Sequence, residues 1–146
     1  MRIVLDTDVL VAALRSDQDA SRQLLLAALN RRFVMLVSVP LMIEYEAVLT
    51  RPEHLAAASI TADEVNTILD ALAAVLEPVR LAFLWRPRLK DATDEMVLET
   101  AVNGTADYVV TFNLKHLGEA ALEFGLRAIT PGAAWREIRE RQHEEK

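Results

Sequence analysis

Acidic and amide side chains occur at positions far apart in the sequence. A single cation could bind several of them if the fold brings them close together. Asp6 and Asp8 end a short apolar run at the N-terminus. Glu44 interrupts an apolar segment, while Asp94 and Asn113 lie near the starts of two expected helices. Two unit charges about 4 Å apart repel by roughly 4 kcal/mol at an effective dielectric constant of about 20, and a hard divalent cation with oxygen ligands would offset this repulsion. The pattern predicts a metal site, although the simpler interpretation of the first stretch is that Asp6 or Asp8 caps the next helix.

Each later carboxylate also has an alternative interpretation. Glu44 could face solvent on its helix, and Glu46 is its nearest competitor for a place in the site. Asp94 would be stabilised by the helix dipole whether or not it has a function, and Asp91 and Glu95 compete with it for a metal role. The arrangement of these residues therefore carries more weight than any one of them.

Composition limits the classes of protein that the chain can belong to. Its 146 residues are 52% hydrophobic, which suits one compact domain spanning residues 1–146. We expect a cytoplasmic protein, because the chain has no cysteine, no signal-peptide pattern and no apolar run long enough for a membrane span. The net charge of −6 repels nucleic acid, so a polyanionic substrate must meet a local basic patch or a bound metal.

Strands and helices alternate along the chain. Apolar runs predict strands at residues 3–5, 33–37, 79–84, 107–111 and 126–129. Helical spacing and capping signals predict helices at residues 9–14, 20–29, 40–49, 61–76 and 94–102, a short helix after Asn113, and a last helix from Pro131 whose charged end, residues 137–146, frays into solvent. This order predicts a three-layer α/β domain with a mainly parallel central sheet flanked by helices.

The topology predicts where the polar residues meet. Right-handed crossovers place the C-terminal ends of parallel strands at one edge of the sheet. Asp6, Ser38, Thr111 and Asn113 each come just after a predicted strand. We therefore expect these four side chains at that edge, although Asn113 could simply cap its helix.

Four stretches, in order and over nearly the whole chain, resemble the PIN-domain ribonucleases, which include the toxin halves of many bacterial and archaeal toxin–antitoxin pairs. They are residues 3–10 (IVLDTDVL), 38–49 (SVPLMIEYEAVL) followed by Arg51-Pro52, 91–101 (DATDEMVLETA) and 106–113 (ADYVVTFN). The resemblance implies a Rossmann-like fold and cleavage of RNA dependent on Mg²⁺ or Mn²⁺. It also implies an antitoxin partner, and we expect a homodimer.

The resemblance also assigns roles to residues. It implies that Asp6, Glu44 and Asp94 are the catalytic, metal-binding carboxylates and that Asn113 completes the metal site. Supporting roles fall to Ser38, Thr111, Asp8 and Asp91. The sequence departs from the family pattern at Asn113, where many relatives carry Asp, and at His116, where many carry another acidic residue. Both departures remove negative charge from the expected site.

The chemistry of phosphodiester hydrolysis agrees with this assignment. The reaction needs an activated water and stabilisation of the charge that builds on the phosphate oxygens, and carboxylate-held divalent metals supply both. No histidine is needed as a base, so we expect His54 and His116 at the surface. Arg86, Arg88 and Lys90, beside Trp85, could hold RNA phosphates with a stacked base, or they could form a solvated loop. The apolar stretch 60–76 offers a docking or dimer surface.

Two alternative functions remain open. Asn113 and His116 favour a PIN fold that has kept a binding role with a weakened catalytic site. Asp6-Thr-Asp8 also resembles the nucleophile motif of haloacid-dehalogenase-like phosphatases, with Lys90 as a possible downstream part. The phosphatase hypothesis leaves Glu44 without a role, and that fold usually needs a longer chain.

Overall fold

The computed structural model describes residues 1–17, 19–82 and 92–144. Strands and helices alternate through these residues, as the sequence predicted. Their bounds are β1 (Arg2–Leu5), α1 (Thr7–Arg15), α2 (Ala20–Leu29), β2 (Val34–Val37), α3 (Val39–Leu49), α4 (Pro52–Ala58), α5 (Ala62–Ala73), β3 (Glu77–Pro78), α6 (Ala92–Asn103), β4 (Tyr108–Val110), α7 (Leu114–Glu123), β5 (Arg127–Ile129) and α8 (Pro131–Glu144).

The strands form one five-stranded sheet in the order β3-β2-β1-β4-β5. Every neighbouring pair is parallel, which confirms the predicted parallel sheet. The chain moves from β1 outward through β2 to β3, and then returns to the other side of β1 for β4 and β5. The order therefore reverses between β1 and β4, and open α/β sheets bind ligands at such a switch point, outside the C-terminal ends of the strands.

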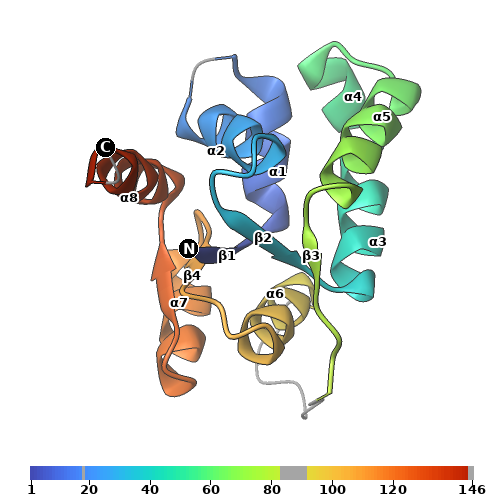
Figure 1. Ribbon diagram of the computed structural model, residues 1–146. Coiled ribbons are helices and arrows are strands. Elements are labelled where there is room, and N and C mark those ends of the chain that lie inside the picture. The colour runs from blue at the N-terminus through green and yellow to red at the C-terminus, as the bar shows by residue number, and fades with distance from the viewer. Residues whose placement is uncertain (18, 83–91, 145–146) are drawn as a thin grey trace.

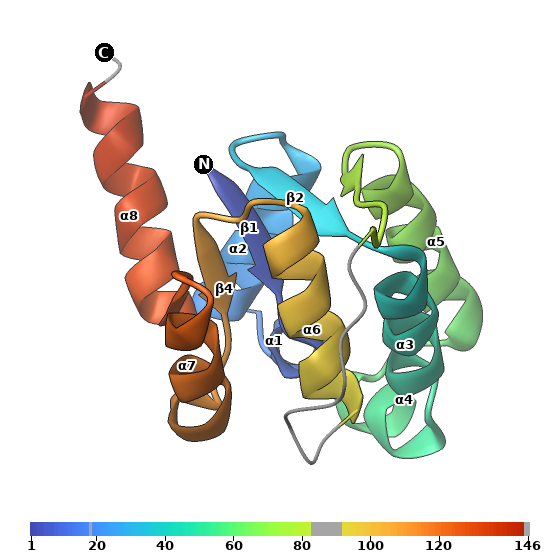
Figure 2. The same ribbon diagram turned by 90° about the horizontal axis from the view of Figure 1, so that it is seen from below.

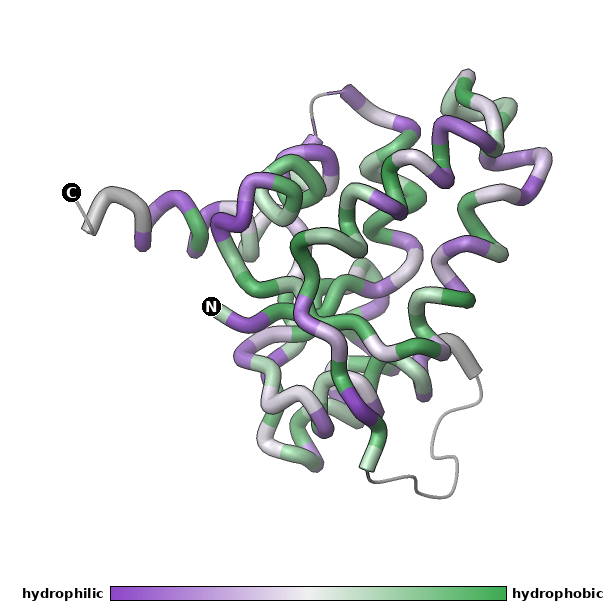
Figure 3. Tube along the Cα trace, turned by 45° about the vertical axis from the view of Figure 1, so that its right-hand side comes forward, coloured by the Kyte–Doolittle hydropathy of each residue, from purple (hydrophilic) through white to green (hydrophobic). Residues whose placement is uncertain are grey.

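Helices cover both faces of the sheet and give the molecule three layers. Figures 1 and 2 show α1 and α2 on one face and α6 and α7 on the other, with α3, α4 and α5 grouped toward the β3 side. The hydropathy colouring of Figure 3 places apolar segments at the centre and hydrophilic ones mainly on the outer helices and turns. Ile3, Val4 and Leu5 of the central strand are each 0% exposed. A strand covered on both faces needs this continuous apolar run rather than an alternating one.

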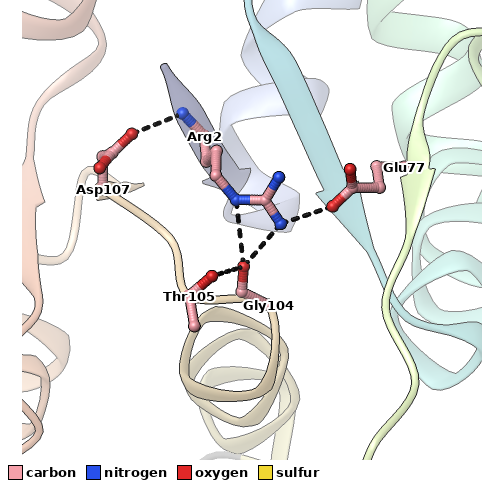
Figure 4. A network of polar contacts seen from close by, with 5 residues as sticks. All are labelled: Arg2, Glu77, Gly104, Thr105 and Asp107. Atoms are coloured by element: carbon pink, nitrogen blue, oxygen red, sulfur yellow. Dashed lines mark hydrogen bonds and ion pairs between the residues drawn. The ribbon is translucent and has the colours of Figure 1, made fainter.

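Arg2 ties together four segments at the N-terminal end of the sheet (Figure 4). Its backbone N–H donates to Asp107 Oδ2 at 2.8 Å, and its guanidinium donates to the Gly104 carbonyl at 2.8 Å and pairs with Glu77. Gly104 directly follows α6, so the guanidinium meets a carbonyl at the partially negative end of that helix. This network holds β1, β3, the end of α6 and the segment before β4 at the edge of the sheet opposite the polar strand ends.

The third strand differs from its prediction. The sequence predicted residues 79–84, whereas β3 is Glu77–Pro78 and pairs with Leu36 and Val37 of β2. The Val79 N–H still donates to the Val37 carbonyl at 2.9 Å, after which the chain leaves the sheet. Pro78 is tolerated because β3 is an edge strand, where the missing N–H costs no ladder bond.

One helix was missed. The sequence predicted that the helix over 40–49 ends near Arg51 because of Pro52, and α3 does end at Leu49. The chain then starts α4 at Pro52 itself, with proline at the beginning of the helix. Proline is favoured there, because its fixed φ suits a helix and the first N–H groups of a helix have no intrahelical partner.

The remaining helices match their predictions with shifted ends. Thr61 and Glu64 form the predicted capping box of α5, with both reciprocal bonds present. The sequence predicted a charged, frayed tail over residues 137–146, and α8 extends through this region to Glu144. Ile138 is 2% exposed and anchors the helix, while Glu137 and Arg141 place opposite charges four residues apart, an arrangement that favours helix. None of the helices in the described part of the chain combines the length and apolar character needed to cross a membrane.

Candidate active site

A cavity of about 420 Å³ opens at the C-terminal ends of β1 and β4. Its walls come from the start of α1, one face of α3, the start of α4, the first turn of α6 and the turn before α7. The lining residues are Asp6, Thr7, Asp8, Val11, Glu44, Val48, Arg51, His54, Asp94 and Asn113. The cavity thus brings together the four residues to which the resemblance assigns a metal, at the switch point of the sheet.

Asp6 is fixed by its neighbours on both sides. Its backbone N–H continues the sheet by donating to the Val110 carbonyl at 2.9 Å, and its carboxylate caps α1 by accepting from the Thr7 N–H at 2.8 Å. The same carboxylate accepts from Thr111 Oγ1 at 2.7 Å. Asp6 is therefore both a helix cap and a wall of the cavity, so the two interpretations of this residue are compatible.

The environment of Asp6 disfavours its charged form. The pKa of Asp6 is raised to about 8. Burial is the main cause and the charge of Asp8 the second, and both outweigh the hydrogen bond from Thr111, which lowers the pKa. Asp94 contributes a smaller push in the same direction. A carboxyl that resists ionisation beside other carboxylates is the electrostatic setting in which a cation binds well.

A chain of hydrogen bonds links Asp6 to Asp94 across three elements. Thr111 Oγ1, which donates to Asp6, accepts from the Asn113 N–H at 2.9 Å. The Asn113 side-chain amide in turn lies 3.4 Å from Asp94 Oδ2. The Asn113 side chain forms no capping hydrogen bond to α7. The Asn113 amide therefore connects the end of β4 to Asp94 on α6 and does not cap α7.

Glu44 reaches the cavity because α3 is held firmly against β1. Tyr45, the next residue, is 0% exposed, and its hydroxyl donates to the Leu5 carbonyl immediately before Asp6. Burial, and secondarily the charge of Asp6, raises the pKa of Tyr45, so the phenol stays protonated as a donor. Glu46 is exposed and does not line the cavity.

The supporting residues fall into three groups. Thr111 contacts Asp6 directly, and Asp8 lines the cavity. Ser38 does not line it: its hydroxyl accepts from the Leu41 N–H as the cap of α3 and lies 2.7 Å from the Thr100 hydroxyl of α6, which joins the two helices that carry Glu44 and Asp94. Asp91, Trp85, Arg86, Arg88 and Lys90 lie outside the described residues.

Two residues of the cavity were missed by the sequence analysis. Arg51 lies two residues after the end of α3 and is the N-cap of α4, where its backbone is extended. Within the described part of the chain Arg51 forms no ion pair, although it shares the cavity with four carboxylates. His54, which we expected at the surface, is partly buried, and no described residue bonds its Nδ1.

The donor set was tested for its fit to a divalent cation. Carboxylate and amide oxygens are what Mg²⁺ and Mn²⁺ bind, and the neighbouring carboxylates of Asp8 and Asp94 give the Asp6 side of the cavity a negative character that suits a cation. Across the described ranges, no three acidic or histidine side chains stand close enough together to enclose an ion directly. Mg²⁺ usually keeps several waters and takes only one or two carboxylates, so the residues fit the ion in kind, with waters between the ion and part of the wall.

Comparison with known proteins identifies the family. A model of the PIN domain matches residues 2–115, which include every residue of the cavity. The chain belongs to the PIN-domain family. PIN domains are generally nucleases and typically use divalent metals. The phosphatase hypothesis based on Asp6-Thr-Asp8 is therefore not favoured.

A solved structure supports the fold of this PIN domain independently. The chain is similar to a chain in the crystal structure of VapBC2 from Rickettsia felis bound to a DNA fragment from their promoter. The two share 16% sequence identity with a TM-score of 0.55, and the similarity covers 89% of this chain and 98% of the other. No curated protein matches the chain significantly in sequence. At this identity the likeness concerns the fold alone.

Proposed function

We propose that this PIN domain is an endoribonuclease that hydrolyses RNA phosphodiester bonds with Mg²⁺ or Mn²⁺ held by Asp6, Glu44, Asp94 and Asn113. The observation that carries the proposal is the convergence of these four side chains, from separate elements, in one cavity at the switch point of the sheet. Membership of a family whose members are generally nucleases supports it.

The residues of the cavity have different roles in the proposed reaction. A bound divalent ion would lower the pKa of a coordinated water and act as a Lewis acid on the phosphate. Asp6 is held for this role by Thr7 and Thr111, and Asn113 orients the Asp94 carboxylate. Arg51 supplies positive charge at the cavity wall, where a guanidinium can bind phosphate oxygens.

The proposal extends to partners. The similar structure is a VapBC2 complex, and we infer that this chain is likewise the toxin component of a toxin–antitoxin pair that acts on RNA in the cytoplasm, and that it forms a homodimer. Val39 and Ile43 are 73% and 62% exposed and lie four residues apart on α3. Apolar side chains on one exposed helix face suit a protein contact. The expected docking surface in the stretch 60–76 is not supported, because Val65, Leu69 and Leu72 of α5 are buried in the core.

Three single substitutions test the catalytic assignment. Asp6→Asn, Glu44→Gln and Asp94→Asn should each abolish Mg²⁺- or Mn²⁺-dependent cleavage of single-stranded RNA while circular dichroism shows a retained fold. Glu46→Gln is the matched control, because Glu46 is on the same helix but exposed and outside the cavity. Wild-type cleavage rates in a folded Asp94→Asn protein would remove Asp94 from the site.

The same assay decides between this proposal and a PIN-fold binding module, which the neutral Asn113 and His116 favour. Metal-dependent cleavage that Asp94→Asn abolishes rejects the binding module. RNA binding without cleavage, in the presence of either metal, supports it. Hydrolysis of a generic phosphomonoester would instead favour phosphatase chemistry.

A further inference from the structure

A second hollow of about 360 Å³ adjoins the active-site cavity. Its lining includes Arg15 and Asp19 from the two ends of the α1–α2 connection and Phe112 from the turn between β4 and α7. Asp8 and Val11 line both hollows, so the two lie next to each other on either side of these residues. A linear polymer whose scissile bond lies among the carboxylates therefore has room for a neighbouring unit in the second hollow.

Phe112 has an unusual position for a large apolar side chain. It is 53% exposed, yet it stands between Thr111, which donates to Asp6, and Asn113, whose amide approaches Asp94. The backbone on both sides is fixed, because the Thr111 N–H donates to the Ile129 carbonyl at 3.0 Å and the Asn113 N–H donates to Thr111 Oγ1 at 2.9 Å. The turn therefore holds the exposed Phe112 ring in a fixed position next to Asp6 and Asp94.

The charges of the second hollow indicate which part of a nucleotide it can take. Asp8 and Asp19 place two carboxylates against the single guanidinium of Arg15. This balance disfavours a phosphate and permits a neutral base. Asp19 Oδ1 already accepts from the Arg22 N–H, while the other carboxylate oxygen is bonded to no described residue. An ionised carboxylate only accepts hydrogen bonds, so it suits a base edge that carries an amino group.

We propose that this hollow is a nucleobase subsite, in which a base next to the scissile phosphate stacks on Phe112 and donates an exocyclic amino group to Asp19. The subsite favours cytosine, adenine or guanine over uracil, because uracil has no amino group. It rests on the proposed ribonuclease function and specifies the substrate as single-stranded RNA, since a paired base is not free to stack on a side chain.

The first test isolates the ring. Binding of a fluorescent ten-nucleotide oligo(C) is measured by anisotropy in the Asp94→Asn background, which prevents cleavage. Phe112→Ala should weaken binding roughly fivefold to a hundredfold, the range for loss of one base–aromatic stack, and Phe112→Tyr should restore it. Leu122→Ala is the control, because Leu122 is 70% exposed on α7 and lies outside the hollow. Equal affinities of the Phe112→Ala and Leu122→Ala proteins would overturn the subsite.

The second test isolates the hydrogen bond. Cytosine and uracil stack similarly but differ in the group at position 4, an amino donor in one and a carbonyl acceptor in the other. Oligo(C) should bind about fivefold more tightly than oligo(U), and Asp19→Asn should remove the difference, since an amide can pair with either edge. Asn caps a helix as well as Asp does, so α2 keeps its cap. Equal binding of the two oligonucleotides by the protein that retains Asp19 would overturn the base preference.

The outcomes separate this proposal from the one on which it rests. Failure of the proposed function appears as wild-type protein that does not cleave RNA with either metal, whether or not it binds RNA. Failure of the subsite alone appears as wild-type cleavage that Phe112→Ala leaves unchanged. A raised KM with little change in kcat in the Phe112→Ala enzyme supports the subsite, because the ring lies beside the carboxylates rather than among them.

Discussion

Two sets of interactions have opposite effects on the ionisation of Asp6. As the cap of α1 it accepts a backbone N–H, an interaction that the charged form strengthens. Its burial and the nearby charges of Asp8 and Asp94 favour the neutral form, and they prevail, since the pKa of Asp6 is raised to about 8. Without a bound cation, ionisation of Asp6 therefore lowers the stability of the folded protein.

The raised pKa of Asp6 predicts a pH-dependent cost. The group ionises near 3.8 when unfolded and near 8 when folded, so its contribution is favourable below about pH 4 and is lost as the pH rises toward 8. Relative to wild type, Asp6→Asn should gain stability with rising pH over this window, by up to about 1.4 kcal/mol per unit. Urea unfolding in EDTA at pH 5 and pH 7.5 measures the gain.

The matched control for Asp6→Asn is Asp70→Asn, which changes an exposed carboxylate on α5. Its effect on the free energy of unfolding should be small at both pH values. If the unfolding free energies of wild type and Asp6→Asn differed by the same amount at both pH values, the raised pKa of Asp6 would be contradicted.

Asn113→Asp should produce two linked effects of opposite sign. The change replaces an amide that lies 3.4 Å from Asp94 Oδ2 with a carboxylate, so it removes the donor and adds repulsion in the metal-free protein. Hard cations bind more tightly as the ligand charge increases. We expect a lower Tm in EDTA and a larger rise with Mn²⁺, measured in paired melts and by calorimetric titration. Unchanged Mn²⁺ affinity would exclude Asn113 from the metal set.

At the scale of elements, the sequence predicted what local patterns determine. The apolar run 3–5 is a central strand, Thr61 and Glu64 form their capping box, and Thr130 accepts from the Ala133 N–H at the start of α8. Because the sheet is parallel, the residues after β1 and β4 had to meet at one edge, and Asp6 and Asn113 line one cavity there. The predicted strand ends were thus enough to place Asp6 and Asn113, whereas Glu44 and Asp94 reach the cavity from α3 and α6, and Ser38 does not line it.

The missed features depend on contacts that no local pattern records. None of the residues of α4 is fully buried, so the segment has no apolar periodicity to detect, and with it Arg51 and His54 were missed as cavity residues. The two residues of β3 are exposed and become a strand only because β2 supplies their partners. Phe112 looks like one more apolar residue after a strand until the fold places it beside a hollow.

Close packing at the end of α6 gives a prediction about two glycines. A Cβ on Gly104 would lie 2.9 Å from the Thr100 carbonyl oxygen and 2.9 Å from Val79 Cγ2. Gly104→Ala should therefore cost about 1–3 kcal/mol of unfolding free energy, as overpacking does. Gly132→Ala is the control, because nothing lies within 4 Å of its Cβ position in α8, and it should stabilise the protein by up to about 1 kcal/mol. Equal chemical-denaturation midpoints for the two variants would contradict this packing.

At the scale of the whole molecule, a divalent cation bound at the proposed site of this acidic protein, whose net charge is −6, would add to its stability. A cation that binds only the folded state stabilises it by about 2.7 kcal/mol at a hundred times its dissociation constant. Millimolar Mn²⁺ or Mg²⁺ should therefore raise the Tm more than NaCl at the same ionic strength, and Asp94→Asn should remove most of the excess. Identical shifts in all three salts would show general screening of charge and no specific site.

The short outer strand β3 also governs how copies of the protein can associate. An open sheet edge normally offers a row of N–H and C=O groups on which a strand of another chain can add, which is the first step toward fibrous aggregates. Here that edge is two residues long, and Pro78 contributes no N–H to it. The described part of β3 is therefore a poor template for adding a strand of another chain, which favours contacts between copies through helix surfaces.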